Sequence, residues 1–226
     1  MMGNHFEQPA ELEVLPRGDA PAAFEKHSEQ IDMERLGRIL GLAVRAMDDE
    51  NIPYALIGGV ASSGLGRPRT THDIDLFVKP HDAERALQAL AARSFDVERT
   101  DHKWIYKGFK DGIQVDVIFN TVGGIYLDRE MLERAVEGEF EGQAVRFVPP
   151  EDLLIIKALV HDEATPRHWF DALGILAATD LDWDYLVRRA RRAQHRLLSL
   201  LLYAKSIDIF VPNRVIRALF LRTYES

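Results

Sequence analysis

Three aspartates in apolar segments are the residues of this chain whose types and spacing could do chemistry. Asp73 and Asp75 alternate with Ile74 and Leu76 in a pattern typical of a strand, so both carboxylates project from one face and the apolar residues from the other. Two carboxylates held side by side repel each other unless a cation lies between them. Asp116 lies in a second apolar strand. If the two strands are neighbours in a sheet, three carboxylates converge and could hold two divalent ions.

A glycine pair supplies a second half of the same site. Gly58 and Gly59 follow a short apolar strand, residues 54–57, and precede small residues that predict a short helix. Glycine lets a phosphate approach the backbone closely, and the N–H groups at a helix start attract anions. Mg²⁺ prefers carboxylate and phosphate oxygens. The two motifs together therefore predict a site for a magnesium nucleotide.

Each of these residues also has a purely structural interpretation. The paired aspartates could lie on a solvated edge strand, Asp116 could pair with a nearby arginine, and the glycines could form only a tight turn. Arg69 and Thr71 precede the paired aspartates at short spacing, which favours the functional interpretation. Arg69 itself could bind phosphate or pair with an acid.

The pattern Gly58-Gly59, Arg69-x-Thr71-x-Asp73-Ile74-Asp75 and a later Asp116 resembles the nucleotidyltransferases of the DNA polymerase β superfamily. Within that group it is similar to the minimal bacterial enzymes, namely the abortive-infection toxin-like and the aminoglycoside nucleotidyltransferases. The resemblance is strong over residues 52–120. Many members have serine where this chain has Gly59, so a hydroxyl for the nucleotide would come from Ser62 or Ser63.

A looser part of the resemblance covers residues 149–178. Toxin-like relatives commonly place a lysine on the helix after the catalytic half and an aspartate on the next helix. By resemblance, Lys157 would reach the triphosphate, and Asp171 would support that lysine or the metal site. The structural alternative is an interhelical ion pair of modest value.

The resemblance implies transfer of a nucleoside monophosphate from a nucleoside triphosphate to an acceptor hydroxyl, with release of pyrophosphate. Asp73 and Asp75 would bind two Mg²⁺ ions, with Mn²⁺ as a substitute, and Asp116 would bind the ion at the acceptor hydroxyl. The acceptor could be an RNA such as a tRNA end, an antibiotic, or a protein side chain. The alternative is a catalytically silent nucleotide-binding module, against which the full set of three acids argues. The residues expected at the nucleotide are Gly58, Gly59, Ser62, Arg69, Thr71, Lys157 and Asp171.

The elements that must position these residues fall into two halves on either side of Pro149-Pro150. Strands and helices mix before this boundary, and the pattern beyond it is helical, which predicts an α+β (mixed α/β) sheet flanked by helices and followed by a helical region. We expect a mobile leader at 1–28, a catalytic domain at 29–149 and a helical C-terminal region at 150–226. Strands are predicted at 54–57, 73–78, 95–98, 103–109, 113–119 and 144–148, and helices at 31–47, 81–93, 151–160, 168–178, 183–203 and 208–221.

Composition excludes several classes of chemistry. Among 226 residues there is no cysteine, which removes disulfides, thiolate metal sites and thiol nucleophiles. No apolar stretch approaches the roughly 20 residues that a bilayer span requires, and the N-terminus lacks an apolar signal core. We therefore expect a cytoplasmic protein with no membrane partner; its oligomeric state is left open.

The net charge of −8 hides a basic C-terminal segment, because residues 185–226 contain nine basic and two acidic residues. Within the predicted helix 183–203, Arg188, Arg192 and Arg196 are four residues apart and would share one stripe. This stripe could contact the backbone of an RNA acceptor, or it could be a solvated helix face. We further expect His72 to be structural, His161 and His168 to lie on helix surfaces, and Trp169 and Trp183 to belong to the core.

Overall fold

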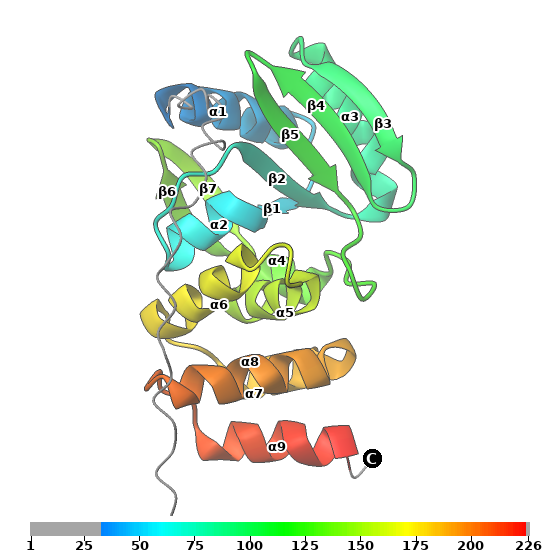
Figure 1. Cartoon of the computed structure of the whole chain (residues 1–226). Coiled ribbons are helices and arrows are strands. Elements are labelled where there is room, and N and C mark those ends of the chain that lie inside the picture. The colour runs from blue at the N-terminus through cyan, green and yellow to red at the C-terminus, as the bar shows by residue number, and fades with distance from the viewer. Residues whose placement is uncertain (1–32, 225–226) are drawn as a thin grey trace, which may run out of the picture. The chain divides into compact units, whose positions relative to one another are not determined.

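A mixed β-sheet forms the upper half of the molecule in the computed structural model, which describes residues 33–224 (Figure 1). Its strand order is β3-β4-β5-β2-β1-β7-β6. β2 runs parallel to β5 and β1 parallel to β7, whereas the other neighbours are antiparallel. The strands are β1 (Tyr54–Leu56), β2 (Asp73–Val78), β3 (Asp96–Asp101), β4 (Ile105–Lys110), β5 (Ile113–Ile118), β6 (Val136–Phe140) and β7 (Gln143–Phe147).

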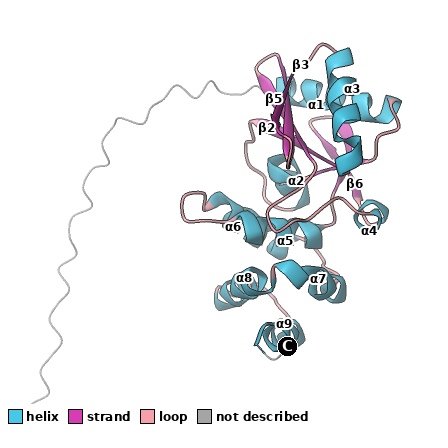
Figure 2. Cartoon of the chain, turned by 90° about the vertical axis from the view of Figure 1, so that its right-hand side faces the viewer, coloured by secondary structure: helices cyan, strands magenta, loops and turns pink. Residues whose placement is uncertain are grey.

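Two helices, α1 (Met33–Asp49) and α3 (Ala83–Ala92), cover one face of this sheet (Figure 2). Their apolar residues recur at helical spacing and are buried, as Leu36, Ile39, Leu40 and Ala43 show in α1. The third helix of this half, α2 (Gly58–Leu65), contacts β2 and also reaches α5 and α6. One end of the sheet is therefore joined to the helical half through α2.

The helical half is stacked in layers below the sheet (Figure 1). α5 (Pro150–Val160) contacts α2, α6, α7 and α8, and α9 contacts α7 and α8. Because α5 packs against neighbours on several sides, its residues from Glu151 to Ala158 are all buried. The remaining helices are α4 (Arg129–Glu133), α6 (Arg167–Ala178), α7 (Trp183–Arg189), α8 (Gln194–Ser206) and α9 (Asn213–Tyr224).

The predicted mixed α+β class is confirmed, and the predicted helix 183–203 is wrong. The chain leaves α7 after Arg189, makes a 3₁₀ turn over Ala190–Arg192, and begins α8 at Gln194. Since the turn contains no glycine or proline, sequence pattern gave no sign of the break. β6 was also missed, because four of its five residues are exposed and only its two end residues, Val136 and Phe140, are large and apolar. The predicted leader 1–28 lies outside the described residues, and the division at 149/150 stays a prediction.

In the described part of the chain, 33–224, no helix combines the length and the hydropathy that crossing a bilayer would require.

Candidate active site

The three carboxylates come together because β2 and β5 are adjacent and parallel. Asp75 lies directly across from Asp116 in the register of this pair. One ligand oxygen each from Asp73, Asp75 and Asp116 lies within 4.8 Å of the others. The sequence left this adjacency conditional, and the pairing of the two strands provides it.

This cluster holds more negative charge than its protein surroundings stabilise. Burial and, after it, the charges of Asp73 and Asp116 raise the pKa of Asp75 to about 7, although Lys157 and the Gly59 N–H oppose the rise. Burial also raises the pKa of Asp116. Carboxylates that repel one another and offer only oxygen donors have the chemistry of a site for a hard divalent cation. The triad could therefore bind a metal ion.

Neighbouring side chains fix the orientation of these carboxylates. Gln114 Nε2 donates to Asp116 Oδ1 at 2.8 Å, and Thr71 Oγ1 donates to Asp73 Oδ1 at 3.0 Å. Lys107 Nζ of β4 lies 3.5 Å from Asp116 Oδ1, so the cation beside Asp116 is a lysine rather than an arginine. Lys107 was not identified from the sequence, although its spacing of two residues from Ile105 and from Phe109 puts all three on the same strand face.

The glycine pair is required by what lies against it. Gly58 begins α2 with φ +66°, and a Cβ there would lie 1.7 Å from Asp75 Oδ2. A Cβ on Gly59 would lie 2.1 Å from Thr71 Oγ1, so the Thr71 side chain fills the space that a serine at 59 would need. Ser62 is fully buried and donates to the Gly58 carbonyl at 2.6 Å. The structure therefore does not bring the Ser62 hydroxyl into the site.

A buried ionic network joins the loop that follows α2 to the helices α5 and α6. The Asp171 carboxylate is fully buried and accepts from Lys157 Nζ at 2.9 Å, from Arg69 Nε and Nη2 at 3.0 and 3.1 Å, and from Arg67 Nη1 at 2.9 Å. Arg67 was not identified from the sequence as part of this site. Of the alternatives for Arg69, the structure shows pairing with an acid.

The pKa values in this network follow from three cations sharing one carboxylate. Burial raises the pKa of Asp171, but hydrogen bonds from Arg69 and the charge of Lys157 outweigh it and lower that pKa to about 2. Burial lowers the pKa of Lys157, and Asp171 only partly opposes it. The charge on Lys157 is thus incompletely compensated, which suits a lysine that would meet a further anion.

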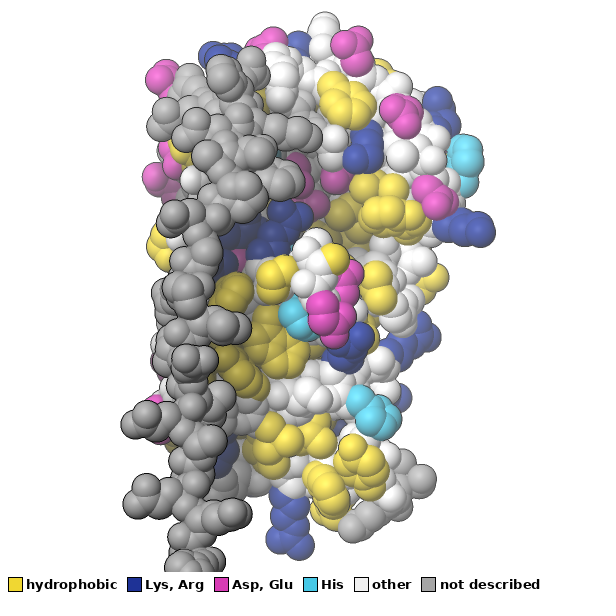
Figure 3. Space-filling view, viewed as in Figure 1, with side chains coloured by type: hydrophobic (Ala, Val, Ile, Leu, Met, Phe, Trp, Pro, Cys, Tyr) yellow, Lys and Arg dark blue, Asp and Glu magenta, His cyan; other side chains and the backbone are white. Residues whose placement is uncertain are grey.

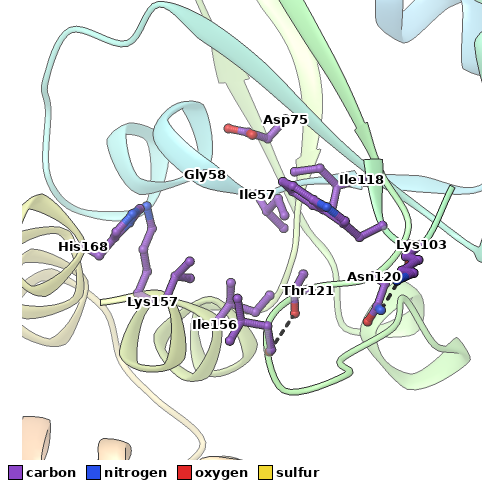
Figure 4. A pocket seen from close by; sticks show the side chains of 13 residues that line it. Ile57, Gly58, Asp75, Lys103, Ile118, Asn120, Thr121, Ile156, Lys157 and His168 are labelled. Atoms are coloured by element: carbon purple, nitrogen blue, oxygen red, sulfur yellow. Dashed lines mark hydrogen bonds between the residues drawn. The ribbon is translucent and has the colours of Figure 1, made fainter. Parts of the chain in front are cut away.

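A pocket of about 420 Å³ lies beside the carboxylates, between the sheet and the helices. Figure 4 shows Asp75 above it, Lys157 and His168 on one side, and Asn120 and Lys103 on the other. In Figure 3, acidic, basic and hydrophobic side chains meet in the hollow between the sheet and the helical half. Its other lining residues are Ile57, Gly58, Trp104, Ile118, Thr121, Val122, Ile156 and Val160.

Two lining residues differ from the sequence expectation. His168 lines the pocket half-buried instead of lying on a helix surface, and burial together with Lys157 and Arg167 lowers its pKa to about 4. The pocket's tryptophan is Trp104, which the sequence did not single out. Trp169 and Trp183 are partly buried against the core.

The predicted arginine stripe does not form as one helix face, because α7 ends before Arg192. Arg188 pairs with Glu130 at 2.6 Å. Arg192 donates to the carbonyl of Gly123 at 3.1 Å and also to that of Gly124. Arg196 is exposed on α8, beyond the break. Contact of these arginines with an acceptor stays a prediction.

Comparison with known proteins gives one family match and several distant structural likenesses. The family model described as "Nucleotidyl transferase of unknown function (DUF2204)" matches residues 37–217, whereas no curated protein sequence matches the chain. The antigenic nucleotidyltransferase-like protein from Paracoccidioides brasiliensis is 18% identical, with 82% of this chain and 92% of that chain covered and a TM-score of 0.49.

Two further solved structures bear names that refer to antibiotics. The lincosamide antibiotic adenylyltransferase LnuA, lincomycin-bound, is 18% identical, with 63% of this chain and 97% of that chain covered and a TM-score of 0.48. ANT(2'')-Ia in complex with adenylyl-2''-tobramycin is 17% identical, with 84% of this chain and 89% of that chain covered and a TM-score of 0.42.

Proposed function

The chain belongs to the nucleotidyl transferase family DUF2204, and on that premise we propose that it transfers a nucleoside monophosphate from a nucleoside triphosphate to an acceptor hydroxyl, releasing pyrophosphate. The observation that carries the proposal is the cluster of Asp73, Asp75 and Asp116 within 4.8 Å, next to the N-terminus of α2. A carboxylate cluster and a helix start that can receive phosphate are the two parts such a transfer needs.

The residues of the site would have different roles according to their positions. Asp73 and Asp75 would hold Mg²⁺ or Mn²⁺, which when bound neutralises the triphosphate and lowers the pKa of an attacking hydroxyl. The backbone N–H groups of Gly58 and Gly59 would receive phosphate oxygens. Lys157, whose buried ammonium is incompletely compensated by Asp171, would add positive charge at the leaving pyrophosphate.

Asp116 would act on the acceptor side. Its carboxylate would help remove the proton of the acceptor hydroxyl while that oxygen bonds to the α-phosphorus and the bond from the α-phosphorus to the bridging oxygen breaks. Gln114 and Lys107 would keep the Asp116 carboxylate in place, since both already contact its Oδ1 atom. Most of the rate enhancement would then come from positioning and charge neutralisation.

The acceptor candidates are an RNA, an antibiotic and a protein side chain. The names of LnuA and ANT(2'')-Ia favour testing lincosamides and aminoglycosides. An aminoglycoside carries several positive charges, but among the residues that line the described pocket only Asp75 is acidic. The charge of the pocket lining therefore gives no particular support to an aminoglycoside. An RNA end fits the basic C-terminal segment, although Arg188 is already paired with Glu130.

Transfer of a labelled nucleotide tests the proposal. The protein is incubated with each α-³²P-labelled nucleoside triphosphate and Mg²⁺, separately with bulk tRNA, an antibiotic panel and a protein extract. We expect label in one class of acceptor, abolished by Asp75→Asn and retained by Asp208→Asn, an equally conservative change at an exposed position. Tight nucleotide binding without transfer or pyrophosphate release under all conditions would refute the proposal in favour of a silent nucleotide-binding module.

A further inference from the structure

One wall of the pocket is apolar and is exposed to solvent. Trp104 is 44% exposed and Val122 is 56% exposed, and Ile118, Ile156 and Val160 extend the same lining. Within residues 33–224, the indole of Trp104 stacks on no other ring and under no cation. Large apolar side chains left exposed at a concave surface mark a ligand site.

The pocket has two chemically different ends, one suited to phosphates and the other apolar. Gly58, Asp75 and Lys157 line it where phosphates would bind, whereas Asp73 and Asp116 do not line it. A ligand whose phosphates meet the start of α2 and Lys157 would therefore extend the rest of its structure along the apolar wall. The acceptor would approach from the side of Asp116, where β4 supplies Lys107.

We propose that this apolar wall binds the nucleoside part of the triphosphate, with the base stacked on Trp104. This inference rests on the proposed function. Stacking suits the wall because a nucleobase is flat and uncharged, and most of the lining residues are apolar. Of the charged ones, Figure 4 shows Asp75 at the top of the pocket, Lys157 on one side and Lys103 on the other, beside Asn120. A volume of about 420 Å³ is within the usual range for small-molecule sites.

Backbone contacts hold the wall in place before a ligand arrives. The Trp104 N–H donates to the Asp101 carbonyl at 3.2 Å, and the Trp104 carbonyl accepts from the Phe119 N–H at 3.0 Å. The turn that carries Val122 is closed by a bridge between Thr121 and Ile125. Arg192 reaches this turn from the helical half, so it is a positioning residue for the wall. A preformed wall loses less conformational freedom on binding.

Equilibrium binding tests the inference apart from catalysis. Isothermal titration measures binding of a nucleoside 5′-(α,β-methylene)triphosphate, which cannot react, and of inorganic tripolyphosphate, which has no base, both with Mg²⁺. Base–aromatic stacking accounts for about 1–3 kcal/mol, so Trp104→Ala is expected to weaken binding of the nucleotide analogue about fivefold to 150-fold. Tripolyphosphate binding should not change. Trp104→Phe should stay within a few-fold of wild type, and Phe210→Ala, which removes another exposed aromatic ring, should have no effect.

The outcomes separate the two proposals. If neither the analogue nor tripolyphosphate binds the wild-type protein, the proposed function fails and this inference fails with it. If the analogue binds wild type and Trp104→Ala equally well, this inference alone is overturned. An unchanged nucleotide affinity with a raised KM for the acceptor would overturn it too and would assign the wall to the acceptor. Circular dichroism of both Trp104 variants confirms that they fold.

Discussion

Asp171→Asn is expected to be among the most destabilising conservative changes in this chain. Asp171 is fully buried, and its two oxygens accept hydrogen bonds from Lys157, Arg67 and Arg69. Asparagine has nearly the same shape as aspartate, but it lacks the negative charge that pairs with Lys157 in this network. Its NH₂ group is also a hydrogen-bond donor and would face the donor groups of Lys157, Arg67 and Arg69. Lys157 is only 2% exposed, so water replaces the lost partner poorly.

The expected loss of stability follows from removing one partner of a buried ion pair while the other stays charged. Removing one partner of such a pair costs about 3–5 kcal/mol, because the other charge is left buried and uncompensated. Asp111→Asn is the matched control: Asp111 pairs with Arg38 at 3.3 Å, but both side chains are more than half exposed. A surface pair of this kind contributes at most about 1 kcal/mol.

Urea unfolding followed by circular dichroism measures both variants. With m-values of about 1–3 kcal/mol/M, Asp171→Asn should lower the urea midpoint by at least about 1 M, whereas Asp111→Asn should barely move it. Adding Lys157→Met to Asp171→Asn should recover part of the loss, since it removes the unpaired charge. The reasoning is refuted if Asp171→Asn costs no more than Asp111→Asn, or if Lys157→Met deepens the loss.

Three further predictions concern the same region. Because the pKa of Asp171 is held at about 2 and an unfolded aspartate titrates near 3.9, its ionisation contributes about 3 kcal/mol of stability above pH ~4. That contribution should be lost as the pH falls from about 4 to 2, and the pH dependence of the urea midpoint should flatten in Asp171→Asn. Gly58→Ala places a Cβ against the Asp75 carboxylate and should weaken Mn²⁺ binding, measured by electron paramagnetic resonance, at least about tenfold by displacing a ligand. Gly112→Ala, at φ +77° with open space around it, should leave Mn²⁺ binding unchanged; an equal loss in both would contradict the steric argument. Arg192→Gln should weaken binding of the nucleotide analogue several-fold without changing tripolyphosphate binding, and unchanged analogue binding would show that the turn at Gly123 needs no such support.

The sequence by itself determined the features that depend on local order. Alternation along a strand placed Asp73 and Asp75 on one face, and the glycine pair predicted a tight connection from a strand to a helix. Pro149-Pro150 separated a region of mixed strands and helices from a helical region. These features follow from side-chain direction and backbone preference within a few residues. Periodicity also located most of the helices and the central strands.

Tertiary structure decided everything that depends on which elements are neighbours. β5 lies beside β2 because the chain returns through α3, β3 and β4, and only that pairing brings Asp116 to Asp75. Arg67 meets Asp171 across 104 residues, and the pocket gathers Trp104 and His168 from opposite halves of the chain. No local pattern encodes such meetings, because they are fixed by how the sheet and the helices bury their apolar faces together. The same packing ends α7 before Arg192, so the arginine acts on a distant turn rather than on a continuous stripe.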